Sequence, residues 1–292
     1  MARGDWSLPL YLLLAALANI IFLKRAVRDA RVRASSHTHA LLALALAELC
    51  WVLPCFAQCA LTFYDNGARW WVPARTGVGC DVMGFYSVFA SVAGQLLTAQ
   101  IAALSAASPL GAPRNASAAV LRDASRCARR SALLLAASLG VAVVPLARDG
   151  GFASSGDGFC YIDWSDAAQV ALMMAVTAPS MVVVVASYVR LARDDAEGRG
   201  RALWPIALLV YVTAWVLWVP AAVIGLTSSR PYPRMFPSGY MLAGALLGHA
   251  QAWINPLLYG VYWRALFIAD DKRQRAIVEG ITLDLTPVTI AA

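Results

Sequence analysis

One carboxylic acid side chain lies deep inside an apolar stretch of this 292-residue chain. Glu48 stands mid-way along the run from His39 to Phe63, and Asn19 and Asn255 lie within two other apolar runs. A charged group at the centre of a bilayer costs about 2.5–3.5 kcal/mol on insertion scales, so in a membrane Glu48 needs partners or a proton. We expect either a polar cluster of the three side chains, holding a shared proton or a Na⁺ ion, or one hydrogen-bonded structural carboxyl.

Sequence patterns that are typical of enzymes and metal sites are missing. The three histidines, His37, His39 and His249, form no set with cysteines or carboxylates at metal-ligand spacing. The chain has neither a glycine-rich phosphate loop nor a Gly-x-Ser-x-Gly nucleophile elbow. Its only lysines, Lys24 and Lys272, lie outside the apolar runs, which excludes a retinal Schiff base within a helix bundle. We therefore predict that the protein is no enzyme and holds no catalytic metal or organic cofactor.

The composition excludes a water-soluble domain. Hydrophobic residues make up 60% of the chain and charged residues only 14%, whereas soluble domains are about 25% charged. Two soluble domains of about 150 residues would lack the polar surface to cover them. The sequence therefore predicts an integral membrane protein whose main surroundings are the lipid bilayer.

Seven apolar runs are long enough to cross a bilayer, which takes about 20 residues each. Backbone amides out of water need internal partners, so runs of this length predict helices. The seven runs are Ser7–Leu23, His39–Phe63, Cys80–Ala107, Ser131–Ala147, Ala168–Val189, Ala202–Leu226 and Pro237–Val261. Pro179, Pro220 and Pro256 interrupt the last three and are expected to kink them. The predicted fold is an all-α, seven-transmembrane helix bundle.

Basic residues are distributed unevenly between the two sides of this bundle. Of the 24 lysines and arginines, 18 follow the first, third, fifth and seventh runs. Because cytoplasmic segments carry an excess of Lys and Arg, the amino terminus is predicted outside the cell and the tail in the cytoplasm. The net charge of +7 is thus explained by topology and predicts no nucleic-acid partner.

Six cysteines are present, and their positions in this topology separate them. Three lie inside the second run and Cys127 lies in a predicted cytoplasmic connection, where thiols stay reduced. Cys80 opens the third run on the outside, and Cys160 lies in the long outside loop before the fifth. We predict a Cys80–Cys160 disulfide that ties this loop over the third run.

Motifs along nearly the whole chain resemble those of one membrane-protein family. Residues 255–259 read Asn-Pro-Leu-Leu-Tyr, residues 218–220 read Trp-Val-Pro, and residues 44–48 read Leu-Ala-Leu-Ala-Glu. Together with Ala18-Asn19, the Cys80 and Cys160 pair and Pro179, they resemble the rhodopsin-like (class A) G-protein-coupled receptors. Arg264 and Phe267 lie in what resembles the short amphipathic eighth helix of that family.

The resemblance implies a receptor domain over residues 1–267 and a short cytoplasmic tail over residues 268–292. It assigns an activation switch to Trp218, Pro220, Pro256 and Tyr259. By position it also implies an outer ligand pocket walled by Tyr86, Ser87, Trp218, Tyr240 and His249, and a transducer face of Ser105, Arg190, Arg199 and Tyr259. The implied partners are an extracellular ligand and a heterotrimeric G protein, and the implied location is the plasma membrane.

The sequence also departs from the family's pattern. Residues 104–106 read Leu-Ser-Ala where the family has Asp-Arg-Tyr, so atypical or constitutive coupling is expected. Ser87 stands where amine receptors carry an aspartate, which argues against a biogenic amine ligand. Glu48 in place of aspartate, the lost Asp-Arg-Tyr and the compact tail are similar to receptors encoded by herpesviruses, of the Epstein–Barr lytic-receptor type; such a receptor would lie in the host cell membrane.

Two alternative functions stay open at this stage. The first is a receptor-like protein that does not couple and acts as a decoy or in receptor heteromers, in a viral setting to modulate immunity. The missing arginine at position 105 favours it. The second is a small transporter or channel that uses Glu48 as its proton or cation site. It predicts an internal repeat, and the sequence shows none.

Overall fold

The computed structural model describes a little over half of the chain in detail, and five long helices account for most of that part. The described residues are 7–28, 38–64, 78–107, 117–148, 151–154, 160–163, 166–196, 250 and 252–257. The helices are α1 (Ser7–Arg28), α3 (Thr38–Tyr64), α4 (Val78–Ala107), α5 (Ser117–Val143) and α6 (Ala167–Ala196). Between α5 and α6 lie a 3₁₀ turn η1 (Pro145–Ala147) and two short strands, β1 (Ala153–Ser154) and β2 (Cys160–Tyr161).

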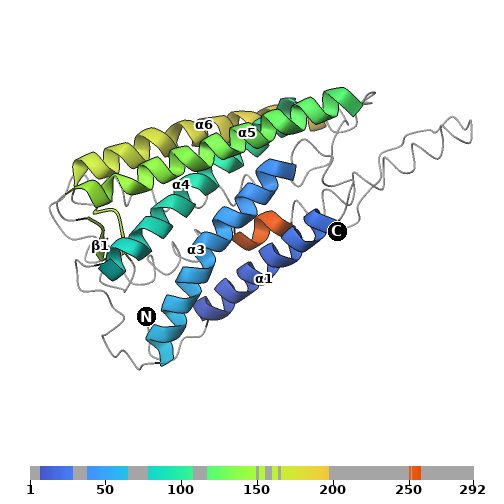
Figure 1. Cartoon of the computed structure of the whole chain (residues 1–292). Coiled ribbons are helices and arrows are strands. Elements are labelled where there is room, and N and C mark those ends of the chain that lie inside the picture. The colour runs from blue at the N-terminus through green and yellow to red at the C-terminus, as the bar shows by residue number, and fades with distance from the viewer. Residues whose placement is uncertain are drawn as a thin grey trace, which may run out of the picture.

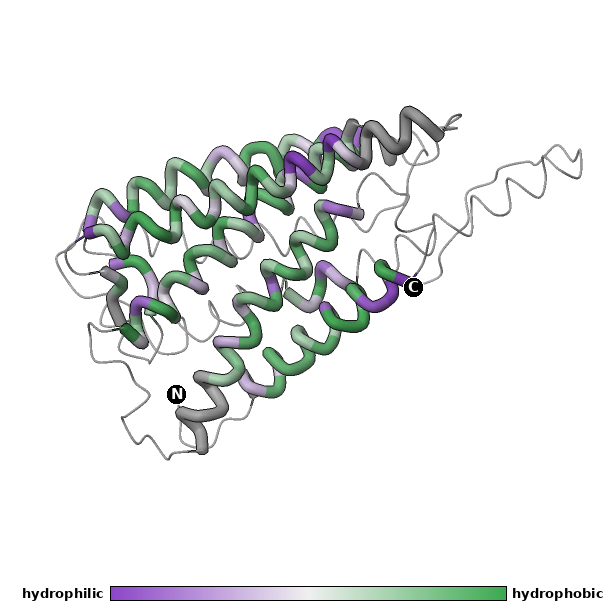
Figure 2. The backbone as a smooth tube through the Cα atoms, viewed as in Figure 1, coloured by the Kyte–Doolittle hydropathy of each residue, from purple (hydrophilic) through white to green (hydrophobic). Residues whose placement is uncertain are grey.

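All five helices are long and apolar enough to cross a membrane. The prediction of membrane-spanning helices is therefore confirmed for the first five runs, and the protein is a helical, multi-pass membrane protein. The predicted sixth run, most of the seventh, the eighth helix around Arg264 and Phe267, and the tail 268–292 lie outside the described residues. Figure 2 shows the apolar colour along most of each helix.

Helix α4 occupies the middle of the described bundle. It contacts α3, α5, α6 and β2, while α1 packs on α3 (Figure 1). Small side chains on α4, including Ala90, Ala93, Ala99 and Ala102, are buried at these contacts. Lipid is as apolar as leucine, so helix association in a bilayer depends on close packing, which small side chains permit.

The helix that carries the fourth span begins well before the apolar run, whereas the span itself, Ser125–Ala147, starts six residues before the predicted start and ends at the predicted residue. The sequence predicted a span over Ser131–Ala147, but α5 begins at Ser117 and ends at Val143. Residues 117–130 are rich in alanine and arginine, which are both strong helix formers, so the helix continues beyond the apolar run. Pro145 has no N–H to continue the α-helical hydrogen bonds, and a 3₁₀ turn that begins at this proline follows instead.

Prolines lie inside two of the helices. Pro179 lies inside α6, as predicted, and Pro54 lies inside α3, which the sequence analysis did not single out. Near Pro179, Thr177 donates a 2.7 Å hydrogen bond from its hydroxyl to the Met173 carbonyl, and Ser180 donates one of 2.7 Å to the Thr177 carbonyl. Both hydroxyls bond back to carbonyls of the preceding turn, as Ser and Thr side chains within helices commonly do.

A close approach between α4 and the segment after η1 depends on a glycine. Phe152 is completely buried, and a methyl group at position 84 would lie 2.5 Å from Phe152 Cβ. Backbone-proximal atoms of a buried ring cannot move aside, so only glycine fits at position 84. Gly140 on α5 is a useful contrast, because a methyl group there would meet nothing within 4 Å.

We expect Gly84→Ala to destabilise the protein by about 1–3 kcal/mol, as overpacking of a filled core does. The matched control Gly140→Ala should be neutral or stabilising by up to about 1 kcal/mol, because alanine is the better helix former. Thermal unfolding of the detergent-solubilised protein measures both. Equal melting temperatures for Gly84→Ala and the unsubstituted protein would contradict the predicted overlap with Phe152.

Candidate functional site

A disulfide closes one end of the bundle. Cys80 in the first turn of α4 and Cys160 in β2 are bonded, with their Cα atoms 5.3 Å apart, and both are buried. The bond joins positions 80 residues apart and fixes the segment before α6 on the start of α4. The predicted Cys80–Cys160 pairing is therefore confirmed, and we call this end of the bundle the disulfide end.

The two strands next to the disulfide form a small antiparallel hairpin. Ala153 pairs with Tyr161 and Ser154 with Cys160. The residues that flank the strands, Phe152 and Ile162, are buried in a cluster with apolar side chains of α4, α5 and α6. The described base of the hairpin is thus packed into the bundle.

Tyr161 anchors the hairpin to α4 well below the disulfide. Its hydroxyl donates a 3.2 Å hydrogen bond to Ser91 Oγ. Ser91 follows Cys80 by three turns, or about 16 Å along the helix axis. Burial raises the pKa of Tyr161 to about 12, against a smaller lowering by the Ser91 hydrogen bond. The phenol therefore stays neutral at any physiological pH.

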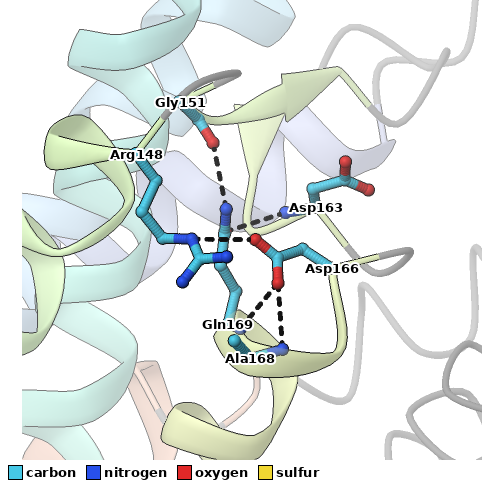
Figure 3. A network of polar contacts seen from close by, with 6 residues as sticks. All are labelled: Arg148, Gly151, Asp163, Asp166, Ala168 and Gln169. Atoms are coloured by element: carbon cyan, nitrogen blue, oxygen red, sulfur yellow. Dashed lines mark hydrogen bonds and ion pairs between the residues drawn. The ribbon is translucent and has the colours of Figure 1, made fainter.

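Asp166 fixes the start of α6 and links it to the end of α5 (Figure 3). Its Oδ1 accepts hydrogen bonds from the backbone N–H groups of Ala168 at 2.9 Å and Gln169 at 3.3 Å, which makes it the N-cap of the helix. Its Oδ2 lies 3.1 Å from Nε of Arg148. Partial burial opposes ionisation, but the two amides and Arg148 outweigh it and lower the pKa of Asp166.

The buried Gln169 completes this network. Its Nε2 donates to the Gly151 carbonyl at 3.3 Å, and its Oε1 accepts from the Asp163 backbone N–H at 3.2 Å (Figure 3). Gly151 has φ +52°, a left-handed conformation that favours glycine, and a methyl group there would lie 2.5 Å from Asp81 Oδ1. Sequence analysis missed Gln169, although Asp166-Ala-Ala-Gln169 before an apolar run resembles a capping box.

Asn19, one of the three predicted polar residues, contacts the segment of the chain that carries another, Asn255. Asn19 on α1 is buried and donates from Nδ2 to the Ala15 carbonyl at 2.9 Å and to the Ala252 carbonyl. Ala252 begins the helical segment 252–257, which includes the buried Asn255 and Pro256 and lies between α1 and α3 (orange in Figure 1). The first span therefore packs against the Asn-Pro segment, 233 residues away in sequence.

Glu48 is buried on α3 and faces α4. It is 6% exposed, and a methyl group at position 94 would lie 3.6 Å from its Oε1. Asn19 Oδ1 and Asn255 Nδ2 are buried without hydrogen-bond partners. Among the described residues no hydrogen bond joins Asn19, Glu48 and Asn255 directly. The predicted cluster, and a proton or Na⁺ at Glu48, thus stay predictions that rest on burial.

Other predicted site residues lie at both ends of the bundle. On α4, Tyr86 is exposed and Ser87 half-buried near the disulfide end, while Ser105 is half-buried near the other end. Arg190 is exposed on α6. The remaining predicted residues lie outside the described part of the chain, and they are Trp218, Pro220, Tyr240, His249, Arg199 and Tyr259.

A polar contact that the sequence analysis missed joins α4 to α5. Gln100 Nε2 donates to the Cys127 carbonyl at 3.3 Å and lies 3.4 Å from Cys127 Sγ. Ser131 Oγ lies 3.2 Å from Gln100 Oε1 and donates to the Cys127 carbonyl at 3.0 Å. This contact is the main polar link between two helices that the structure describes toward the end opposite the disulfide.

Comparisons with known proteins add no assignment. No protein-family model matches the chain, and a search of curated proteins finds no match. Within the residues that the structure describes, no group of three His, Cys, Asp or Glu side chains could hold a metal ion. Functional inference therefore rests on the arrangement of the chain's own residues.

Two variants separate the cap and the charge of Asp166. At neutral pH, Asp166→Ala should lower the stability of the folded protein by about 0.5–2 kcal/mol, because the N-cap is lost, whereas Asp166→Asn keeps a good cap. The charge contribution is full above the ordinary pKa of 3.8 and is lost as the pH falls through the lower folded-state value.

Melting temperatures of the three proteins between pH 7 and pH 3 test this. The unsubstituted protein should lose stability more steeply on acidification than Asp166→Asn. Parallel curves for these two proteins would show that the contact with Arg148 contributes no charge-dependent stability.

Proposed function

We propose that the chain is a rhodopsin-like seven-transmembrane receptor that signals across the plasma membrane by atypical or constitutive coupling to a G protein. The observation that carries the proposal is the disulfide from the first turn of α4 to the hairpin before α6. The resemblance implies a bridge at these two positions, and the hairpin that it holds lies against α4. In this proposal the disulfide end is extracellular and the tail is cytoplasmic.

The pairing of the first span with the Asn-Pro segment supports the same proposal. Asn19 donates a hydrogen bond to the Ala252 carbonyl, three residues before Asn255. A contact between the first and last predicted spans is what a closed bundle of seven helices would require. In the proposed receptor the last span carries Pro256 and Tyr259 of the activation switch, and this contact would connect it to the first span.

Signalling in this proposal is a population shift between two packings of the bundle. A ligand, where one exists, acts only through its different affinities for the two packings. Kinks at Pro220 and Pro256 would let the cytoplasmic ends of the last two spans move while the disulfide end stays fixed. The cleft that opens would be lined by Ser105, Arg190, Arg199 and Tyr259.

The serine at position 105 decides how coupling is regulated. In the family an arginine at this position restrains the resting state and then meets the G protein. Ser105 lies half-buried in the last turn of α4 and is too short to do either. We infer that the resting state is weakly held, so that the receptor is active without ligand.

A nucleotide-exchange panel over all G-protein classes tests coupling without a known ligand. Membranes that contain the protein should raise exchange on at least one class above membranes without it. Ser105→Arg should lower that basal exchange by a factor of about two to five, which corresponds to a restraint of about 0.4–1 kcal/mol on the active population. Ser105→Ala, which adds no restraint, is the matched control and should leave the basal exchange unchanged.

The opposite pattern would support the non-coupling alternative. If surface expression is normal, no class responds and Ser105→Arg gains exchange, the chain acts as a decoy or in heteromers. That alternative is favoured by the same substitution of arginine by serine. Epitope labels at the two chain ends test the orientation separately, and the proposal requires that only the amino-terminal label is reached on intact cells.

A further inference from the structure

Helix α5 has one buried face and one exposed face along its apolar length. The buried row consists of Cys127, Ser131, Ser138 and Ala142, and it faces α3 and α4. On the other side Leu133, Ala136 and Gly140 are exposed. In a protein with several membrane-spanning helices, an exposed apolar row on an outer helix contacts the acyl chains of lipids.

Three arginines continue this exposed row toward the start of the helix. Arg126, Arg129 and Arg130 are all exposed, and Leu133 follows them by seven, four and three residues. Residues at these spacings lie on one side of a helix. We call Arg126, Arg129 and Arg130 the arginine face of α5. The arginine face lies one to two helical turns before Leu133, about 5–10 Å along the helix axis. This distance matches the depth of the lipid headgroup layer.

The arginine face is a dense positive charge. Its three arginines lie within five consecutive residues, in the first six positions of the membrane-spanning segment Ser125–Ala147 of α5. No salt bridge joins Arg129 or Arg130 to a carboxylate among the described residues. Guanidinium groups bind phosphate through two parallel hydrogen bonds, which an ammonium group cannot do.

Other exposed basic side chains at this end of the bundle are more scattered. Arg25 and Arg28 end α1, and Arg193 lies in the last turns of α6. Figure 2 shows hydrophilic colour at the end of α1 and in α5 ahead of its apolar part. Scattered basic side chains at one end of a bundle are explained by membrane orientation alone. Three arginines on one lipid-facing row can in addition contact a single lipid headgroup.

We propose that the arginine face of α5 binds the phosphorylated inositol headgroup of a phosphoinositide lipid. Such a headgroup carries several phosphates close together and so matches three guanidinium groups on one face. Phosphatidylserine offers one carboxylate and one shared phosphodiester and matches them poorly. The lipid would lie with its acyl chains along Leu133 and Gly140 and its phosphates at Arg126, Arg129 and Arg130. This site requires that α5 crosses the membrane with its start on the cytoplasmic side, where phosphoinositides lie, and it does not depend on receptor function.

Native mass spectrometry of the full-length protein, with phosphatidylinositol 4,5-bisphosphate added to detergent micelles, tests the proposal. The triple variant Arg126→Gln, Arg129→Gln, Arg130→Gln should reduce the bound lipid at least about tenfold. The matched control Arg25→Gln, Arg28→Gln, Arg193→Gln removes the same charge at the same end and should reduce it by less than about threefold. A third variant with lysine at positions 126, 129 and 130 keeps the charge and should bind at an intermediate level.

Three outcomes would overturn the proposal. Equal losses in the two glutamine variants would mean that the whole basic rim attracts lipid without a site. Equal binding of phosphatidylserine and the phosphoinositide by the unsubstituted protein would mean that only charge is recognised. Full binding by the glutamine variant, whose folding is checked by its melting temperature, would place the lipid elsewhere.

Discussion

The described structure depends above all on the attachment of one loop to the middle helix. The disulfide from Cys80 to Cys160 brings the hairpin onto α4, and Gly84 leaves the space that the buried Phe152 fills. Helix α4 also contacts α3, α5 and α6, so the order imposed on the loop extends to the start of α6 through Asp166 and Gln169. Three helices and a hairpin therefore share one fixed end.

Much of this architecture could be predicted from the sequence because a bilayer accepts only long apolar segments whose backbone hydrogen bonds are satisfied internally. The free energy of transfer into lipid adds up over about 20 apolar residues, so the first five spans are evident from the sequence. For four of them the predicted first residue lies within a few residues of the start of the helix. The side of the membrane assigned to each loop then left Cys80 and Cys160 as the natural pair. The start of α5 could not be found in this way, since hydropathy ends with the bilayer while helix propensity in residues 117–130 does not.

The side-chain contacts could not be predicted, for a different reason. The hydrogen bond of Tyr161 to Ser91 and that of Gln100 to Cys127 join residues 70 and 27 positions apart. Each depends on the rotation of one helix against another, and apolar periodicity in a membrane span scarcely encodes this rotation, because lipid and protein neighbours are equally apolar. The sequence correctly indicated that Glu48, Asn19 and Asn255 are buried. It could not indicate which atoms each of these side chains contacts.

The two ends of the described bundle are held by different kinds of interaction. At the disulfide end a covalent bond, a capped helix and the ion pair of Arg148 with Asp166 fix the loop on three helices. Toward the other end the described links are the packed small residues and the Gln100, Cys127 and Ser131 contact, whose groups could re-pair after a small shift. Movement of one helix past another costs less where hydrogen bonds can exchange than where a covalent bond must break. A shift of one helix past another is therefore expected to cost less at the end that carries the arginines than at the disulfide end.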